Sequence, residues 1–157
     1  MNVISLFSGC GGLDLGFEKA GFDVPVANEF DPTIFETFKV NHPKTHLIEG
    51  DVRQVTKEDI APFIDGEVDG IIGGPPCQDF SSAGHRDENL GRAVLTYTYR
   101  DIILRIKPKY FVMENVPEIT KSAILKEIKD SFKEAGYGLT ERVLDASYCG
   151  VPQSRKR

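Results

Sequence analysis

Cys77 follows two prolines in residues 73–81, GGPPCQDFS, and is well suited to act as a nucleophile. Each proline ring fixes φ of its own residue, so the backbone that presents the thiol is restricted, and rigid placement favours nucleophilic attack. A cysteine taken at random is more often buried and inert, and we predict this for Cys10 and Cys149. The three cysteines stand far apart and at no metal-ligand spacing, which predicts free thiols and neither a disulfide framework nor a metal site.

A glycine-rich segment, FSGCGG at residues 7–12, lies between an apolar run and a helical pattern. Small residues there let backbone N–H groups approach a bulky ligand. A dinucleotide fingerprint would need glycine at position 14, where Asp14 stands, so another adenosine-bearing cofactor is favoured over NAD. Glu29 ends the next apolar run and could accept from both ribose hydroxyls. Asp51 follows the third run and could accept from an adenine amino group. Singly, each carboxylate is as often a cap or turn residue; three features in register favour cofactor binding.

Apolar runs alternate with helical patterns along the chain, which predicts a mostly parallel α/β sheet. Ligands of such sheets bind beyond the carboxyl ends of the strands, so the chemistry should collect there. Residues 73–92 show no clear periodicity and predict a long functional loop. Buried helix faces are expected at Ile34, Phe35 and Phe38, and at Ile124, Leu125, Ile128 and Phe132. Strands are expected at residues 3–7, 24–28, 45–48, 68–72, 110–114 and 139–144.

The composition of the 157 residues, 40% hydrophobic and 27% charged, predicts one globular domain. There is no apolar run of about 18 residues, and the first ten residues are too short and uncharged for a signal peptide, so we expect a cytoplasmic protein. The net charge of −5 argues against a basic nucleic-acid-binding module. However, residues 1–91 hold 6 basic and 16 acidic side chains, whereas residues 92–157 hold 13 and 8. The basic end could contact phosphate, although a short basic tail is more often only solvated.

Four segments together resemble the motifs of one enzyme family. GGPPCQDFSSAG is similar to the nucleophile motif of DNA cytosine-5 methyltransferases, and FSGCGG is similar to their S-adenosyl-L-methionine motif. ENV at residues 114–116 resembles the family's ENV motif, and GVPQSRKR at residues 150–157 resembles its GVPQxRxR motif. Their order and spacing also match, over the entire chain. The resemblance implies a Rossmann-like methyltransferase fold, C-terminally incomplete, with residues 1–157 as a catalytic and cofactor-binding domain.

The resemblance implies methyl transfer from S-adenosyl-L-methionine to C5 of a flipped-out cytosine in duplex DNA. C5 is a poor nucleophile, so the Cys77 thiolate adds to C6, and Glu114 protonates or hydrogen-bonds N3 as charge develops. Arg155 and Arg157 complete the catalytic set, and a positive charge nearby would favour the thiolate. The sequence does not identify the base that removes the C5 proton, and water is one candidate. Flipping the base costs on the order of a few kcal/mol.

Further contacts follow from the same resemblance. Phe30 would pack on the adenine, and Pro76 would lie near the sulfonium. The small residues of the Cys77 segment are equally typical of any loop. Cofactor contacts are expected at Phe7, Ser8, Gly9, Gly11, Gly12, Leu13, Glu29, Phe30, Asp51, Val52 and Pro76. DNA contacts are expected at Gln78, Ser81, Arg86, Arg92, Asn115, Gln153 and Arg155.

The chain departs from the family pattern at its C-terminal end. Family members usually continue past the RxR motif into further strands and a target-recognition domain, which is absent here. We therefore expect a truncated or split methyltransferase, completed by a second polypeptide or a missing C-terminal segment. A non-catalytic S-adenosyl-L-methionine-binding subunit and a transfer RNA cytosine-5 methyltransferase remain alternatives. A thiol oxidoreductase is disfavoured because no second cysteine lies near Cys77 in sequence. A restriction–modification role and a regulatory role both remain open.

Overall fold

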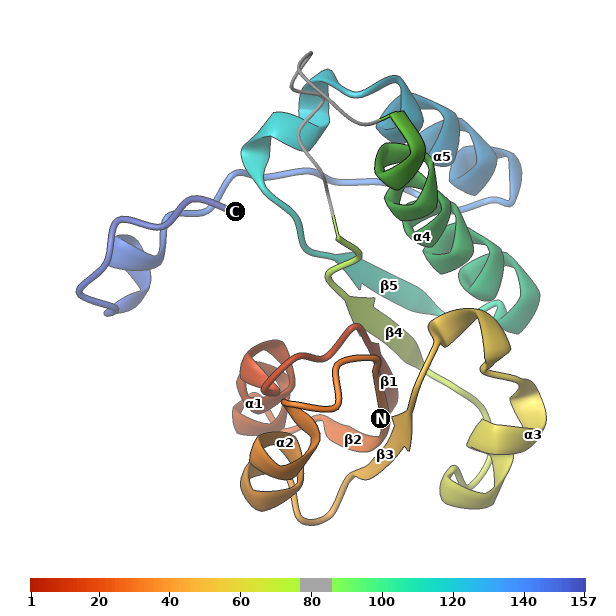
Figure 1. Cartoon of the computed structure of the whole chain (residues 1–157), viewed down its shortest axis with the longest axis vertical. Coiled ribbons are helices and arrows are strands. Elements are labelled where there is room, and N and C mark those ends of the chain that lie inside the picture. Colours follow the sequence, from red (N-terminus) through yellow and green to blue (C-terminus); the bar gives the residue numbers. More distant parts are fainter. Residues whose placement is uncertain (77–85) are drawn as a thin grey trace.

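Five parallel strands form a single sheet in the order β3-β2-β1-β4-β5. The structure, a computed structural model, describes residues 1–76 and 86–157, without the side chains of residues 86–93 (Figure 1). The strand order runs outward from β1 in one direction and from β4 in the other, so the switch point of the sheet lies between them. The strands are β1 (Asn2–Leu6), β2 (Asp23–Glu29), β3 (His46–Glu49), β4 (Gly70–Gly73) and β5 (Tyr110–Met113).

Helices cover both faces of the sheet, which is why the central strands are apolar on both sides. On one face, Ile4 and Ile71 pack with side chains of the long helix and of the last helix. On the other face, Val3 and Ile72 pack with the first helix. The helices are α1 (Gly12–Lys19), α2 (Phe35–Asn41), α3 (Lys57–Ile60), α4 (Arg86–Ile106) and α5 (Ala123–Glu134). Short 3₁₀ turns are η1 (Val52–Gln54), η2 (Ala61–Phe63), η3 (Pro117–Lys121) and η4 (Ala146–Cys149).

The two expected helix faces are confirmed. Phe38 of α2 is fully buried against Ala27 and Leu47 of the sheet. In α5, the Ser122 side chain caps the helix by accepting from the Ile124 N–H at 3.1 Å. Its buried residues are Leu125, Ile128 and Phe132, as the spacing predicts.

The expected strand at residues 139–144 is absent, and this prediction is wrong. Leu144 exchanges backbone hydrogen bonds with Arg157, at 2.7 and 2.9 Å, and thus pairs with the end of the chain and not with β5. Val143 and Leu144 remain exposed. Among the described residues no strand pairs with the outer side of β5, so β5 is an edge strand. Residues 143–157 project to one side of the body (Figure 1). We call these residues the C-terminal arm.

One further expectation on the element boundaries needs correction. Residues 86–92 were expected within a loop, but α4 begins at Arg86. The other five strands are confirmed, each with ends shifted by no more than two residues. Such shifts are ordinary because strand ends are set by pairing with the neighbouring strand and not by hydrophobicity alone. Within the described parts of the chain, no helix is both long and apolar enough to span a bilayer.

Asp14 on α1 is a fully buried carboxylate, and neither of its oxygens has a hydrogen-bond partner among the described residues. Burial raises the pKa of Asp14 above its ordinary value of 3.8, because desolvation penalises the charged form. The folded state therefore holds this proton more tightly than the unfolded state does. The associated stability is complete at pH below about 3.8 and is lost as the pH rises through the folded-state pKa.

We predict that Asp14→Asn is more stable than the wild type at pH 7 and loses this advantage near pH 4. Asparagine carries no charge to desolvate, and a tenfold change in the ionisation constant corresponds to about 1.4 kcal/mol. Urea unfolding at several pH values measures the difference. Asp130→Asn, on the exposed side of α5, is the matched control and should show no such dependence. An Asp14→Asn variant that is less stable at pH 7 than at pH 4, relative to wild type, would contradict the prediction.

Candidate functional site

The expected site residues gather at the carboxyl edge of the sheet. The glycine-rich segment follows β1, Glu29 ends β2, Gly74 follows β4 and Glu114 follows β5. Because all five strands are parallel, these ends lie at one edge, and the pair β1 and β4 forms the switch point where α/β proteins bind ligands. The edge therefore brings together residues that lie far apart in the sequence.

Left-handed backbone shapes the turn between β1 and α1. Gly9 and Gly11 have φ of 56° and 81°, a conformation that glycine adopts without steric cost. The Gly11 N–H donates to the Ser8 carbonyl at 2.9 Å, and Ser8 donates to the Asn28 carbonyl through its N–H at 3.1 Å and its Oγ at 3.2 Å. The turn is thus tied to β2 and opens into the N-terminus of α1, where backbone N–H groups favour negative charge. We call residues 7–12 the glycine turn.

Side chains next to the glycine turn pack partly into the core. Phe7 also has a positive φ, and its ring centroid lies 6.4 Å from that of Tyr99. Leu13 contacts the cluster around Val3 and Ile72. These contacts fix both ends of the turn.

Glu29 connects the glycine turn to the end of β2. Its Oε2 accepts from the Gly9 N–H at 2.7 Å, and its Oε1 accepts from the N–H groups of Phe30 and Asp31, each at 2.8 Å. A carboxylate offers about four acceptor positions, so these three bonds leave capacity for one more donor. Phe30 next to it is 69% exposed, which leaves its ring free to cover a planar ligand.

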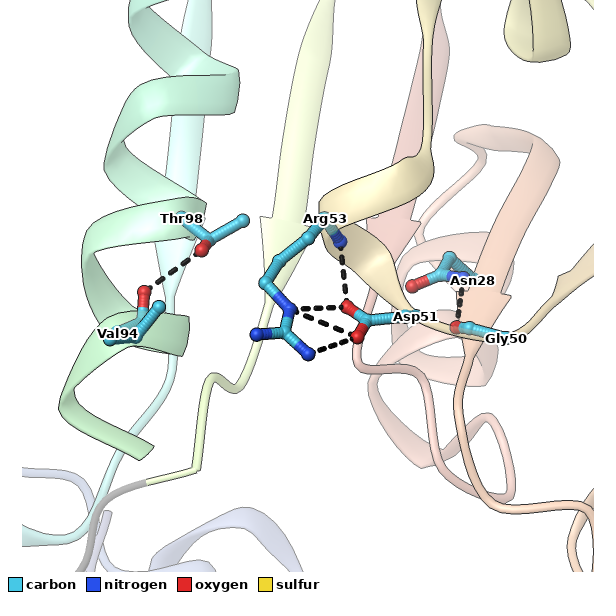
Figure 2. Close-up of polar contacts among 6 residues, drawn as sticks. All are labelled: Asn28, Gly50, Asp51, Arg53, Val94 and Thr98. Atoms are coloured by element: carbon cyan, nitrogen blue, oxygen red, sulfur yellow. Dashed lines mark hydrogen bonds and ion pairs between the residues drawn. The ribbon is translucent and has the colours of Figure 1, made fainter. Parts of the chain in front are cut away.

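Asp51 caps η1 and is paired with Arg53 (Figure 2). Its Oδ1 accepts from the Arg53 N–H at 2.9 Å, and Nε of Arg53 lies 3.0 and 2.9 Å from the two carboxylate oxygens. Arg53 NH2 also pairs with Oδ2. The Arg53 guanidinium holds the pKa of the Asp51 carboxyl below its ordinary value. Arg53 was not among the expected site residues, although an arginine two residues after Asp51 is well placed to pair with its carboxylate.

The turn that carries Asp51 is anchored to the neighbouring strand. The Asn28 side-chain amide donates to the Ile48 carbonyl at 2.9 Å and to the Gly50 carbonyl at 3.0 Å, and the second bond is drawn in Figure 2. Val52 is 3% exposed and packs in the core, so its side chain supports the turn from within. Asp51 is thereby held at the same edge as Glu29.

Glu114 and Arg157 form an ion pair at the end of β5, with 3.0 Å between Oε1 and Nε. Both side chains are about one-third exposed, 38% and 31%, so the pair is open to a ligand. The two residues lie 43 positions apart in the sequence, and the structure brings them into contact. The Glu114 backbone N–H donates to the Gly73 carbonyl at 2.9 Å, which fixes its place relative to β4.

The segment after β4 lies against Glu114. A Cβ at Gly74 would lie 2.9 Å from Oε2 of Glu114, so only glycine fits without displacement. Asn115 donates from its side-chain amide to the Pro75 carbonyl at 2.9 Å and accepts from the Val116 N–H at 2.9 Å. These contacts hold the two prolines beside the Glu114 carboxylate, and they engage both polar atoms of the Asn115 side chain. Pro76 is half-buried and ends the described part of this segment.

We predict that Gly74→Ala lowers kcat about tenfold, because the added methyl group displaces the Glu114 carboxylate. Gly138→Ala is the matched control: a Cβ there meets nothing within 4 Å, and activity should not change. The methyl transfer that the motif resemblance implies, measured at saturating cofactor, tests the pair. Equal kcat for both variants would contradict the importance of this contact.

Other expected site residues lie apart or cannot be placed. Cys77, Gln78 and Ser81 lie outside the described residues. Arg86 and Arg92 belong to α4, and their side chains are outside the description. Gln153 and Arg155 are exposed on the C-terminal arm, where the Asp145 carboxylate accepts from Ser147 and Ser154 side chains and from the Arg155 N–H at 3.2 Å.

The prediction that Cys10 and Cys149 are buried is wrong, because both are exposed, free thiols. Cys10 lies in the glycine turn between two glycines at positive φ, which leaves its side chain outside the core. Cys149 ends η4 on the C-terminal arm. Cysteine composition alone could not show that either residue falls on an irregular, solvent-facing segment.

The family model for C-5 cytosine-specific DNA methylases matches residues 1–157. The chain belongs to this family. The resemblance of the four motifs is thereby confirmed, and so is the expected Rossmann-like methyltransferase fold, which solved members share. The Type II methyltransferase M.HindV of Haemophilus influenzae is 54% identical, with all of this chain and 51% of the relative covered. M.NgoPII of Neisseria gonorrhoeae is 50% identical, with 100% and 46% covered.

Solved structures of family members agree over the whole described fold. A putative DNA modification methyltransferase encoded within an E. coli prophage has a TM-score of 0.86 at 36% identity, covering 99% of this chain and 44% of that one. The S. pombe Dnmt2 methyltransferase has a TM-score of 0.81 at 25% identity, covering 99% and 48%. This family member thus spans about half the length of the relatives it matches.

Proposed function

We propose that this chain is the cofactor-binding and catalytic part of an enzyme that transfers a methyl group from S-adenosyl-L-methionine to C5 of cytosine in duplex DNA. The contact between Glu114 and Arg157 beside Gly74 carries the proposal, because it joins three of the four motifs at the carboxyl edge of the sheet. Family membership supports the reaction class. We take residues 1–157 as the catalytic domain.

The glycine turn and its neighbours fit the cofactor. The N-terminus of α1 suits the cofactor's carboxylate, Glu29 has acceptor capacity for a ribose hydroxyl, and Phe30 is exposed for stacking on adenine. When bound, the cofactor supplies a sulfonium methyl group that a carbon nucleophile attacks. We assign its contacts to Phe7, Ser8, Gly9, Gly11, Gly12, Leu13, Glu29, Phe30, Asp51, Val52 and Pro76.

The chain's own residues would make cytosine C5 nucleophilic. The Cys77 thiolate adds to C6, and the electron pair of the C5–C6 bond shifts toward the ring nitrogen N3. Glu114 protonates or hydrogen-bonds N3, with Arg157 holding the carboxyl in place at 3.0 Å. After methylation, a base removes the C5 proton, the C5–C6 double bond re-forms and the Cys77 sulfur leaves with its bonding electrons. Arg155 is assigned to the same catalytic set.

DNA is the proposed substrate, with the target base flipped into the site. Exposed Gln153 and Arg155 on the C-terminal arm are assigned to DNA contacts, and residues 92–157 carry the basic excess of the chain. Gln78, Ser81, Arg86, Arg92 and Asn115 complete the proposed DNA contacts. The Asn115 side chain also holds Pro75 through one N–H of its amide, and the second N–H remains for a DNA acceptor.

A second polypeptide or a C-terminal segment carrying the target-recognition domain is the proposed partner. Relatives are about twice as long as this chain. The edge strand β5 exposes Val112 at 38%, and the C-terminal arm exposes Leu144 at 62% and Tyr148 at 91%. Unpaired strand edges and apolar patches of this kind favour cover by further polypeptide. A cytoplasmic restriction–modification setting is proposed from the Type II methyltransferase relatives.

The experiment that tests the proposed function supplies methyl-labelled S-adenosyl-L-methionine with duplex DNA or with transfer RNA. The chain is assayed alone and with extract of its source cells, which provides any partner. The proposal predicts label in 5-methylcytosine of the DNA. Label only in transfer RNA would move the substrate to RNA, and cofactor binding without label in either would support a non-catalytic subunit.

A further inference from the structure

A buried histidine lies directly beneath the glycine turn. A Cβ built on Gly11 would lie 2.0 Å from Nε2 of His42 and 2.4 Å from its Cδ2. These distances are far below van der Waals contact, so the backbone at Gly11 rests against the imidazole with no room for a side chain. None of the four sequence motifs contains His42.

His42 is held rigidly in this position. His42 is 3% exposed, and its ring stacks on the Phe38 ring, with 4.7 Å between the ring centroids and 25° between the ring planes. Nδ1 lies 3.2 Å from Oε2 of Glu18, which orients the ring from α1. The His42 N–H donates to the Phe38 carbonyl at 2.8 Å, and the Thr45 N–H donates to the His42 carbonyl at 3.0 Å. A ring fixed from three sides can transmit its position to the backbone above it.

The surroundings of His42 are polar, which is costly inside a protein. Asp14 and Ser5 are buried in the same region, and their side-chain oxygens lack hydrogen-bond partners among the residues that the structure describes. Glu18 and Asp14 of α1 and His42 at the end of α2 thus form one polar cluster. An apolar filling of this corner would avoid the desolvation cost. The cluster is therefore not explained by stability alone.

We infer that His42 is a positioning residue for the cofactor: its imidazole supports Gly11 and sets the position of the backbone N–H groups of the glycine turn. The inference rests on the proposed function, which places the cofactor at this turn. Two separate features of the structure then favour glycine at position 11. One is its left-handed φ of 81°, and the other is the imidazole that occupies the space of a Cβ. Misplacement of a bound reactant by about 1 Å can reduce the reaction rate about 10²-fold.

A double-mutant cycle between Gly11 and His42 tests the inference. Gly11→Ala is expected to weaken S-adenosyl-L-methionine binding about 30-fold, since its methyl group meets the ring, and His42→Ala about tenfold. In the double variant the alanine methyl enters the space that the ring has left. The double variant should therefore bind more tightly than Gly11→Ala alone, whereas independent effects would make it weaker than either single variant.

Three comparisons separate positioning from packing. His42→Phe keeps a flat ring on Phe38 and should bind the cofactor within about threefold of wild type. Glu18→Gln, which frees the ring without opening a cavity, should raise the cofactor KM and leave kcat unchanged. Phe132→Leu, on the opposite face of the sheet, should lower Tm and leave cofactor affinity unchanged. Because His42→Phe and Glu18→Gln remove no core volume, they test the inference even where His42→Ala does not fold.

The outcomes distinguish the inference from the function it rests on. Calorimetry measures the dissociation constant, and thermal unfolding reports Tm for each variant. Wild-type chain that binds no S-adenosyl-L-methionine would overturn the proposed cofactor site. Wild-type binding with unchanged affinity in His42→Ala or in Glu18→Gln, much weaker binding in His42→Phe, or additive effects in the cycle, would overturn the positioning role alone.

Discussion

Replacing Glu114 with glutamine is expected to lower kcat about 10²- to 10³-fold. Glutamine keeps the shape of the side chain, so its contact with Gly74 and its place after β5 are retained. The amide cannot deliver a proton to N3 of cytosine, and it loses the charge that pairs with Arg157 at 3.0 Å. Single-turnover methyl transfer at saturating S-adenosyl-L-methionine measures the effect. The cofactor's dissociation constant should remain within about threefold of wild type.

Glu118→Gln provides the matched control for this experiment. Glu118 is exposed on η3, only four residues further along the chain, and the same change of charge there should leave kcat unaltered. A Glu114→Gln variant with kcat within threefold of wild type would contradict the assignment of Glu114 to N3. A large rise in the cofactor KM with unchanged kcat would instead give Glu114 a binding role.

Replacing Cys77 with serine is expected to lower the rate of methyl transfer at least about 10³-fold. This is the largest effect that the proposed mechanism predicts. A serine hydroxyl is a far weaker nucleophile near neutral pH than a thiolate, so addition to C6 fails. Binding of S-adenosyl-L-methionine should persist, because the proposed cofactor contacts lie mainly on the glycine turn and at Glu29. The measurement is label transferred to duplex DNA, with calorimetry for the cofactor.

Cys149→Ser is the control for the loss of one thiol. Cys149 is exposed on the C-terminal arm and has no proposed contact with cofactor or base. Transfer should be unchanged in this variant. Residual transfer above one-tenth of wild type in Cys77→Ser would rule out the thiolate as the attacking group.

Most of the sheet could be predicted from the sequence because its strands are buried on both faces. Neighbouring apolar residues such as Val3 and Ile4, or Ile71 and Ile72, pack on opposite faces of the sheet, as expected of strands covered on both sides. The failure at residues 139–144 has a physical reason of the same kind. A segment becomes a strand only where a neighbouring strand offers backbone partners, and Leu144 pairs with Arg157 in place of a strand.

The candidate site could likewise be predicted only in part. Motif residues that act locally, such as Gly9 and Gly11, could be placed from spacing, since a left-handed turn after a strand demands glycine. Contacts made across the fold could not. Pairing of Glu29 with the Gly9 N–H and support of Gly11 by His42 depend on how the elements pack.

The covalent step is tested most directly with duplex DNA that contains 5-fluorocytosine, because fluorine at C5 cannot be removed as a proton and the adduct persists. The chain is incubated with this DNA and S-adenosyl-L-methionine, alone and with extract of its source cells, and the complex is denatured and digested for mass spectrometry. The account predicts a denaturation-resistant, methylated adduct on the peptide that contains Cys77, absent in Cys77→Ser. No adduct under either condition, with cofactor binding intact, would contradict cytosine-5 methylation of DNA through Cys77.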